Sequence, residues 1–338
     1  MNKLERLLWP LAALLLLVLG LIVAGPQVAA RQPQGGTWAS TPPMPIFRSE
    51  HNATVLNGKI YVGGGLAGPN QFFTATTDVF QVYDPLAARW TNLAPLPDRL
   101  HHFGIATLNG RIYVTGGYTG DDFNVDNKAV YVYTPQARQQ ASWKQVANMP
   151  SERAAHASVA AGGLLYVVGG VGPDASATWA YNPATNTWNA SRAPLPTLRE
   201  HITAAVVNDR IYVISGRWGG QNISTVEEYN PATNTWTSKA PIPTARSGIT
   251  SAVLDGKIHV TGGEDLSSAN TYYQHEVYDP ATNTWATLPR MPTSRHGLAS
   301  GAANGRWFVI GGGLLAGNQT YSSLTNIVEA FTPFPAGR

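Results

Sequence analysis

The chain has 338 residues, a formal net charge of +3 and no cysteine. The lack of cysteine excludes disulfides, thiolate nucleophiles and cysteine-ligated metals. The small positive charge does not indicate nucleic-acid binding, because the basic residues are spread along the chain rather than clustered. Charged residues make up 13% of the chain, which is unlike the composition of most disordered proteins.

Residues 1–30 differ from the rest of the chain. Lys3 and Arg6 precede an uncharged run at 7–25, and small residues follow up to Ala30, a pattern typical of an export signal. The run is also long enough to span a bilayer. Two alternatives therefore stay open: cleavage after Ala30, or retention of residues 7–25 as an anchor in the cytoplasmic membrane. Both predict an exported chain on the periplasmic or extracellular side, and residues 31–37 read as a polar linker.

The remaining chain repeats one unit, whose clearest copy is VYDPATNTW at 277–285. This copy predicts a strand, a tight turn and a second strand that opens on Trp. We expect Asn186, Asn234 and Asn283 to adopt the left-handed conformation that ends this turn. A glycine-rich strand precedes the unit in six places, namely 60–65, 112–117, 165–170, 211–216, 258–263 and 307–312. A recurrence every forty to fifty residues indicates a propeller or a solenoid.

Four strands, a double glycine after the second, Tyr before the turn and Trp after it resemble the kelch repeat. The resemblance covers roughly residues 38–333. It implies an all-β, six-bladed propeller over 38–338 that forms one domain and acts as a monomer. Trp38 lies in the closing strand of a repeat whose earlier strands are missing. At the other end, residues 328–331 form a third strand that no Trp strand follows. We expect these two segments to pair, so that the N-terminal strand closes the last blade.

A set of arginines recurs three residues after the proline that ends each Trp strand. In the second blade Arg99 stands one place early, and Leu100 holds the matching position. Pseudo-symmetry would place the set around the central channel, and guanidinium groups bind carboxylates or phosphates. The kelch adaptors of animal ubiquitin ligases resemble this arrangement and receive acidic peptides. The ligand-binding candidates are Arg48, Arg153, Arg199, Arg246, Arg295, Tyr118, Arg217 and Trp218.

Three functions stay open. The first is binding of an acidic glycan or an acidic protein segment at this arginine-lined mouth. The second is isomerisation of an acidic sugar, because the chain resembles bacterial N-acetylneuraminate epimerase in architecture. That resemblance implies Glu264 with His201 or Glu200 as an acid–base pair, and Arg217 or Arg246 as the clamp on the sugar carboxylate. The third is a protein-interaction scaffold, in which the sides of the propeller contact partner domains and the channel is only packed. A structural interpretation of the arginines also stays open, in which each pairs with carbonyls of a neighbouring blade or with a local carboxylate such as Glu50, Glu152 or Glu200.

The sequence predicts neither a metal site nor a cofactor. A copper radical site of the galactose oxidase type needs a cysteine, which is absent. The histidines near the mouth, with Glu50, stand at non-equivalent offsets in different blades; they are His51, His101, His102, His156, His201 and His296. His101 and His102 are sequence neighbours, and neighbours on a strand point to opposite faces. The spaced Glu, Asp and His of the iron-using plant specifier proteins are not found.

Overall fold

The computed structural model describes residues 35–135 and 142–334, in which strands alternate with turns and irregular connecting segments. The predicted signal or anchor at 1–30 lies outside these residues, as does most of the predicted linker. Within the described part of the chain, no helix is both long and apolar enough to cross a bilayer. The described residues group into one compact unit.

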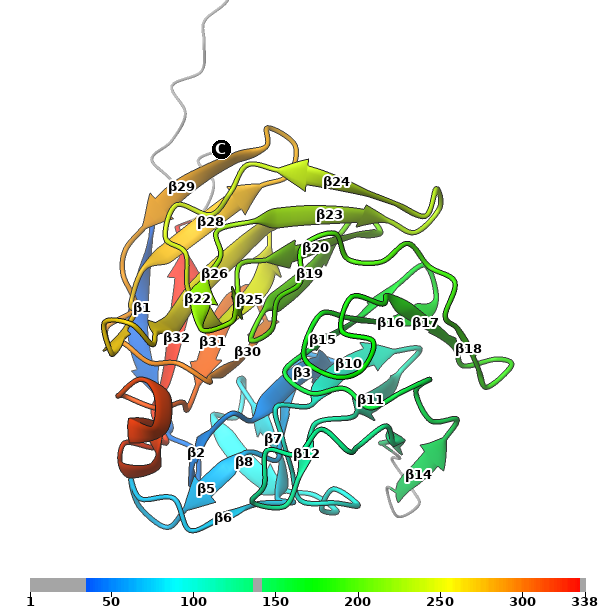
Figure 1. Ribbon diagram of the computed structural model, residues 1–338. Coiled ribbons are helices and arrows are strands. Elements are labelled where there is room, and N and C mark those ends of the chain that lie inside the picture. The colour runs from blue at the N-terminus through cyan, green and yellow to red at the C-terminus, as the bar shows by residue number, and fades with distance from the viewer. Residues whose placement is uncertain (1–34, 136–141, 335–338) are drawn as a thin grey trace, which may run out of the picture. The chain divides into compact units, whose positions relative to one another are not determined.

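Six large antiparallel sheets, five of four strands and one of five, form the main part of this unit in the described residues (Figure 1). Sheet 1 contains β3 (Asn52–Leu56), β4 (Lys59–Gly63), β7 (Phe80–Asp84) and β8 (Arg89–Asn92). Sheet 2 contains β10 (Gly104–Leu108), β11 (Arg111–Thr115), β13 (Val130–Thr134) and β14 (Ser142–Val146). Sheet 3 contains β15 (Ala157–Ala161), β16 (Leu164–Val168), β17 (Trp179–Asn182) and β18 (Thr187–Asn189).

The second half of the chain repeats the pattern. Sheet 4 contains β19 (Thr203–Val207), β20 (Arg210–Ile214), β23 (Val226–Asn230) and β24 (Thr235–Lys239). Sheet 5 contains β25 (Ser247–Leu254), β26 (Lys257–Asp265), β28 (His275–Asp279) and β29 (Thr284–Leu288), with β27 (Asn270–Thr271) paired to β26. Sheet 6 contains β30 (Ala299–Ala303), β31 (Arg306–Ile310), β32 (Val328–Pro333) and β1 (Gly36–Thr41).

Sheet 6 is built from both ends of the described chain. β1 pairs antiparallel with β32, and in this register Trp38 lies opposite Phe331. The strand starts at Gly36, two residues before the first residue of the predicted propeller. As a result β1 occupies the outer position that β8, β14, β18, β24 and β29 occupy in the other sheets.

Neighbouring sheets pack face to face through apolar clusters. The described residues form six such clusters, one for each pair of adjacent sheets, and one of them joins sheet 6 to sheet 1. In that cluster Phe308 and Ile310 contact Ile60 and Tyr83, and all four side chains are buried. The first strands of the sheets lie nearest the centre, where β30 contacts β3 (Figure 1).

Turn residues have the conformations that their chemistry predicts. Asn186, Asn234 and Asn283 have φ between 53° and 56°, as expected for the left-handed end of the turn. Each Trp that follows such a turn donates its indole N–H to a carbonyl of the preceding sheet; for example, Trp236 Nε1 lies 2.9 Å from the oxygen of Ala193. The repeated tryptophans therefore join neighbouring sheets.

The double glycine brings backbones of adjacent sheets together. Gly64 has a φ of 62°, and a Cβ built on it would lie 2.4 Å from the carbonyl oxygen of Leu100 in the segment that leads into sheet 2. Side chains cannot occupy that position without moving the backbone. The next residue, Gly65, donates its N–H to the same oxygen at 2.7 Å.

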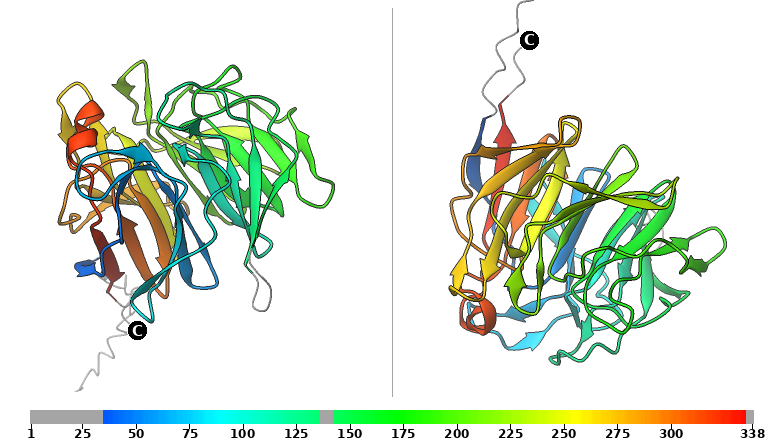
Figure 2. Two further views of the ribbon diagram at one scale, coloured as in Figure 1. Left: turned by 90° about the horizontal axis from the view of Figure 1, so that it is seen from below. Right: turned by 45° about the horizontal axis from the view of Figure 1, so that its top comes forward.

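One face of the unit carries the short connecting elements. These are β2 (Phe47–Ser49), β5 (Leu66–Gly68), β6 (Ala75–Thr76), β9 (Leu100–His101), β12 (Tyr118–Thr119), β21 (Arg217–Trp218), β22 (Gln221–Asn222) and the 3-10 helix η1 (Gly317–Ser322). Figure 2 shows η1 at the opposite end of sheet 6 from the start of β1 and the end of β32. We call the η1 side the mouth face.

Candidate functional site

Six backbone positions form a closed hydrogen-bonded ring where the sheets meet. Each N–H donates to the carbonyl of the equivalent residue in the preceding sheet, at distances of 2.7 to 3.1 Å. The bond from Glu50 N–H to Gly297 oxygen, 2.7 Å long, joins sheet 1 to sheet 6. We call this the axial ring; its members are Glu50, His102, Ala155, His201, Gly248 and Gly297.

All six positions have φ between 51° and 63°. Glycine adopts this conformation freely, whereas a residue with a Cβ pays about 1–2 kcal/mol for it. Gly248 and Gly297 show that the ring accommodates glycine. The three ionisable residues Glu50, His102 and His201 are therefore held in a strained conformation at the centre of the molecule, which is typical of functional sites.

Two cavities meet at these three side chains. The axial cavity, of about 160 Å³, is lined by all six ring members and by the first strands of the sheets. The mouth cavity, of about 250 Å³, opens on the mouth face. Glu50, His102 and His201 line both cavities. The site therefore has a polar floor at the ring and apolar walls above it that include Tyr118, Phe123 and Tyr321.

The floor is a continuous network of ionisable side chains. Arg217 donates to Glu264 at 2.5 Å and to Glu200 at 2.7 Å, so two carboxylates flank one guanidinium group. His201 contacts Glu200 through Nδ1. His296 Nδ1 lies 3.2 Å from Glu264. Glu264 also accepts the backbone N–H of Gly317 at 2.7 Å, which ties the floor to η1.

Burial sets the electrostatics of the floor. Burial, and then the nearby carboxylate of Glu264, raise the pKa of Glu50 to about 8, although Arg217 opposes the shift. Burial also lowers the pKa of His102 well below its usual value, and neighbouring His201 and His101 add to this effect. Burial also lowers the pKa of His201 well below its usual value, and the positive charge of Arg217 is the next cause.

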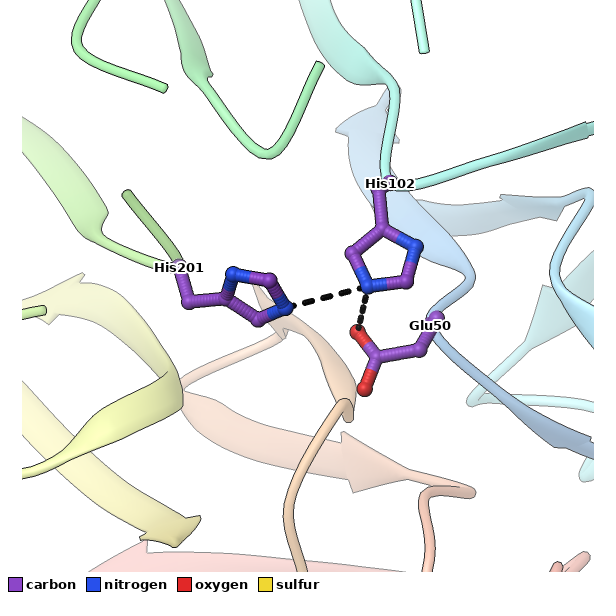
Figure 3. Close-up of side chains that lie close together, drawn as sticks. All are labelled: Glu50, His102 and His201. Carbon is purple, nitrogen blue, oxygen red and sulfur yellow. Dashed lines mark hydrogen bonds and ion pairs between the residues drawn. The ribbon is translucent and has the colours of Figure 1, made fainter. Parts of the chain in front are cut away.

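Glu50, His102 and His201 converge closely enough to hold a metal ion, as Figure 3 shows. His102 Nε2 lies 3.0 Å from His201 Nε2 and 3.2 Å from a carboxylate oxygen of Glu50. The prediction that His101 and His102 point to opposite faces is wrong. Their Nδ1 atoms lie 2.6 Å apart, because the positive φ of His102 breaks the alternation of the strand.

The five repeated arginines lie inside the sheets rather than along an open mouth. Their exposed fraction is 0%, so a ligand has no access to them in this structure. Arg199 bonds Glu227 at 2.6 Å, Arg246 bonds Glu276, and Arg295 bonds Glu329 at 2.7 Å. Arg48 bonds Gln81, and Arg153 lies 4.0 Å from the ring centre of Trp179. Each arginine also donates to backbone carbonyls near the double glycine, such as Gly64, Gly169, Gly262 and Gly311.

The partners of the arginines share a position in the repeat. Gln81, Glu227, Glu276 and Glu329 each stand two residues before the Tyr or Phe of the third strand. In sheet 2, where Leu100 replaces the arginine, Tyr131 takes this place. An arginine and a polar third-strand residue therefore occur together in four sheets, which explains the arginines as internal ties.

The mouth cavity brings together five of the predicted site residues: Tyr118, Glu200, His201, Arg217 and Glu264. Trp218 does not line the cavity; it is 41% exposed on β21. Glu50, His102 and His296 also line it, although the sequence placed them only near the mouth. Their signal is their place in the repeat: Glu50 stands two residues after Arg48, His102 two residues after Leu100, and His296 directly after Arg295.

Comparisons with known proteins agree with this architecture. The KLHDC2/KLHL20/DRC7 Kelch-repeats domain matches residues 102–313, and the Kelch motif matches residues 48–97. The chain belongs to the kelch-repeat family. Kelch domains generally serve as protein-interaction modules.

Several curated relatives are similar over part of their length. Kelch-like protein terF of Aspergillus terreus is 30% identical over 215 residues, which cover 57% of this chain and 46% of terF. Kelch-like protein 36 of Bos taurus is 28% identical over 187 residues, covering 54% of this chain and 29% of that protein. The kelch chain thus spans less than half the length of these relatives. The solved structure of YjhT has a TM-score of 0.69 at 18% identity, covering 86% of this chain and 97% of that one, which shows the fold alone.

Proposed function

We propose that this kelch chain is an exported six-bladed propeller, closed by its N-terminal strand β1, that binds one sugar unit of a glycan in the mouth cavity. The observation that carries the proposal is the combination of a polar floor with aromatic walls. A volume of about 250 Å³ is just below the range of about 300–1,000 Å³ typical of drug-sized ligands. It suits a ligand of one ring.

The walls and floor offer the two kinds of contact that a sugar needs. The rings of Tyr118 and Phe123 are in contact, with centroids 5.1 Å apart and planes tilted by 53°, and Phe123 is 49% exposed. Such faces pack against the C–H groups of a sugar ring. Arg217, Glu264 and the imidazoles below supply donors and acceptors for hydroxyl groups. A few oriented polar groups in an otherwise apolar pocket are typical of specific small-molecule sites.

The burial of the arginines changes the expected charge of the ligand. Among the described residues that line the cavity, Arg217 is the one with a permanent positive charge, and Glu200 and Glu264 already flank it. An acidic ligand would have to compete with both carboxylates. We therefore propose a neutral sugar as the ligand of the mouth cavity, and the binding test also includes an acidic sugar as the alternative.

Binding can be tested with the folded protein and a panel of glucose, galactose, N-acetylglucosamine and N-acetylneuraminate, followed by titration calorimetry and ligand-observed NMR. Phe123→Ala should weaken binding at least about tenfold, because the side chain is part of the wall and its loss removes stacking worth about 0.5–1.5 kcal/mol together with buried area. Leu86→Ala is the matched control, since Leu86 is an 83% exposed apolar side chain in a hairpin turn outside the cavity. If none of these sugars binds, or if Leu86→Ala weakens binding as much as Phe123→Ala, the proposal fails.

A second candidate is isomerisation of the bound sugar, as in N-acetylneuraminate epimerase. The observation in its favour is that carboxyl and imidazole groups adjoin on the floor, with Glu50 3.5 Å and Glu264 3.2 Å from His296 Nδ1. This arrangement departs from the predicted pair of Glu264 with His201 or Glu200, because Arg217 holds both carboxylates. NMR exchange between the two anomers of N-acetylneuraminate would measure it. A rate equal to that in buffer would leave binding without catalysis.

Docking of a protein segment on the mouth face is the third outcome. Phe72, Phe123, Trp218, Leu266 and Leu315 are large apolar side chains with 39% to 52% exposed surface, carried by the loops of this face. Exposed aromatics favour protein contacts. A chain that binds no sugar but whose solution partner is released by Trp218→Ala would have this function.

A further inference from the structure

We propose that Glu50, His102 and His201 form a binding site for a divalent transition-metal ion such as Zn²⁺, set in the axial ring between the two cavities. Two histidines and one carboxylate are a common ligand set for Zn²⁺ and Fe²⁺, with further positions left open for water or substrate. The side chains are nearly buried, at 5% exposure for His102, 10% for Glu50 and 11% for His201. The site adds to the proposed sugar pocket but does not depend on it.

The spacing of the three ligand atoms fits a metal ion. Ligands about 2.1 Å from an ion lie about 3.0 Å apart at 90° and about 3.4 Å apart at a tetrahedral angle. The observed separations of 3.0 Å between the two Nε2 atoms and 3.2 Å between His102 Nε2 and Glu50 fall within this range. All three ligand atoms lie within 4.8 Å of one another (Figure 3).

The hydrogen bonds around His102 leave its Nε2 atom without a proton. His101 Nε2 lies 3.1 Å from the carbonyl oxygen of Asp122, which only accepts, so His101 must donate from Nε2. In a neutral ring His101 Nδ1 is then an acceptor, and the 2.6 Å contact requires His102 Nδ1 to donate to it. His102 Nε2 is therefore a lone pair directed at the site.

His201 is oriented in the same way. Its Nδ1 contacts the carboxylate of Glu200, which makes Nδ1 the donor and leaves Nε2 without a proton, as an acceptor. A carboxylate behind a ligating histidine is the usual outer partner of a metal site. Arg217 Nη2 lies 3.1 Å from the same Nε2, so an ion would compete with one hydrogen bond there.

The result is two lone pairs that face each other across 3.0 Å, with Glu50 beside them. Two acceptors at this distance repel each other unless a donor or a cation reaches them, and Arg217 Nη2, 3.1 Å from His201 Nε2, is such a donor for one of the two. A metal ion satisfies both nitrogens at once and favours the ionised carboxylate of Glu50. The positive φ that all six ring members share aims the side chains of these three residues at one point.

The axial ring itself provides variants that should fold. Ala155 occupies the equivalent ring position in sheet 3 with a φ of 51°, so His102→Ala and His201→Ala each reproduce a residue that the ring already accepts. Glu50→Gln removes the charge and keeps the shape. His259→Gln is the matched control, because His259 is buried and its Nδ1 lies 2.9 Å from His275 Nε2 in a pair with no third ligand among the described residues.

The experiment uses the full chain, stripped with a chelator and titrated with Zn²⁺ and, separately, Co²⁺. Calorimetry, metal analysis after dialysis and the visible absorption of bound Co²⁺ are the readouts. We expect one ion per chain, and a loss of affinity of about 100-fold or more in His102→Ala and His201→Ala, with His259→Gln unchanged. Circular dichroism verifies folding, and either histidine variant suffices if the other does not fold.

Two results would overturn the inference. One is that the wild-type chain retains neither Zn²⁺ nor Co²⁺, in which case a proton bridges the two imidazoles. The other is that the folded histidine variants bind as tightly as the wild type, which would place any ion elsewhere. Because metal alone is the probe, this test is independent of whether a sugar binds.

Discussion

The clearest test of the buried arginines is Arg246→Met. Arg246 has no exposed surface and donates to Glu276 and to the carbonyls of Gly262 and Thr244, at 2.8 and 2.9 Å for the two carbonyls. Removing the guanidinium leaves the Glu276 carboxylate buried with one remaining donor, the Thr244 hydroxyl at 2.9 Å. Loss of one partner of a buried pair costs about 3–5 kcal/mol, and we expect the lower end, about 3–4 kcal/mol, because that donor remains.

The assay is urea unfolding followed by tryptophan fluorescence. With a slope of about 3 kcal/mol per molar, the midpoint should fall by about 1 M. Glu276→Gln should cost much less, about 1 kcal/mol, because Gln81 already serves Arg48 in sheet 1. The double variant Arg246→Met, Glu276→Leu should recover most of the loss, since an apolar pair replaces the ion pair.

An Arg246→Met protein with unchanged stability would refute this reasoning. It would mean that the guanidinium contributes nothing to joining β26 and β28. A simultaneous loss of ligand binding would support the hypothesis that the repeated arginines bind the ligand. Equal destabilisation by Arg246→Met and by the double variant would instead show that the bonds to the carbonyls dominate.

Three further predictions concern the fold. Gly64→Ala should lower the unfolding free energy by at least about 2 kcal/mol more than Gly110→Ala, since both have positive φ but only Gly64 meets a neighbour, and urea midpoints would measure the difference. Trp236→Phe should cost about 1 kcal/mol, because the donor to Ala193 is lost, and a thermal melt at unchanged folding would check it. Burial lowers the pKa of His156 to about 3, so the unfolded state binds the extra proton and the unfolding free energy falls as pH drops from about 6.5 toward 3. His156→Gln should reduce the slope of unfolding free energy against pH by about 1.4 kcal/mol per pH unit. An equal slope in the variant and the wild type would contradict a buried neutral ring.

The repeat made the strands and turns predictable from local chemistry. Double glycines, Asn-Gly pairs and the Trp after each turn determine the backbone conformation of the few residues around them. The structure places Asn283 in the left-handed conformation, as expected. The all-β fold and the kelch family follow from these signals. The environment of the arginines does not, because it depends on a partner about thirty residues away across loops of different length.

The site was only partly predictable for a similar reason. The sequence placed Arg217, Glu264 and His201 at the mouth, and they do line one cavity. The alternation rule failed at His102, where a positive φ turns the side chain toward the axis. At the ring positions glycine is the residue type that indicates this conformation, as Gly248 and Gly297 do in two of the six sheets, and His102 gives no such indication.

The axial ring has a consequence for how the molecule unfolds. A linear stack of repeats has two ends, and an end repeat can detach by breaking one interface. In the ring each peptide group donates to one neighbour and accepts from the other, so detaching any one sheet breaks two of the six bonds and exposes two apolar clusters. The sheets therefore lose their independence, and the six ring amides should exchange with deuterated solvent only when the whole unit opens.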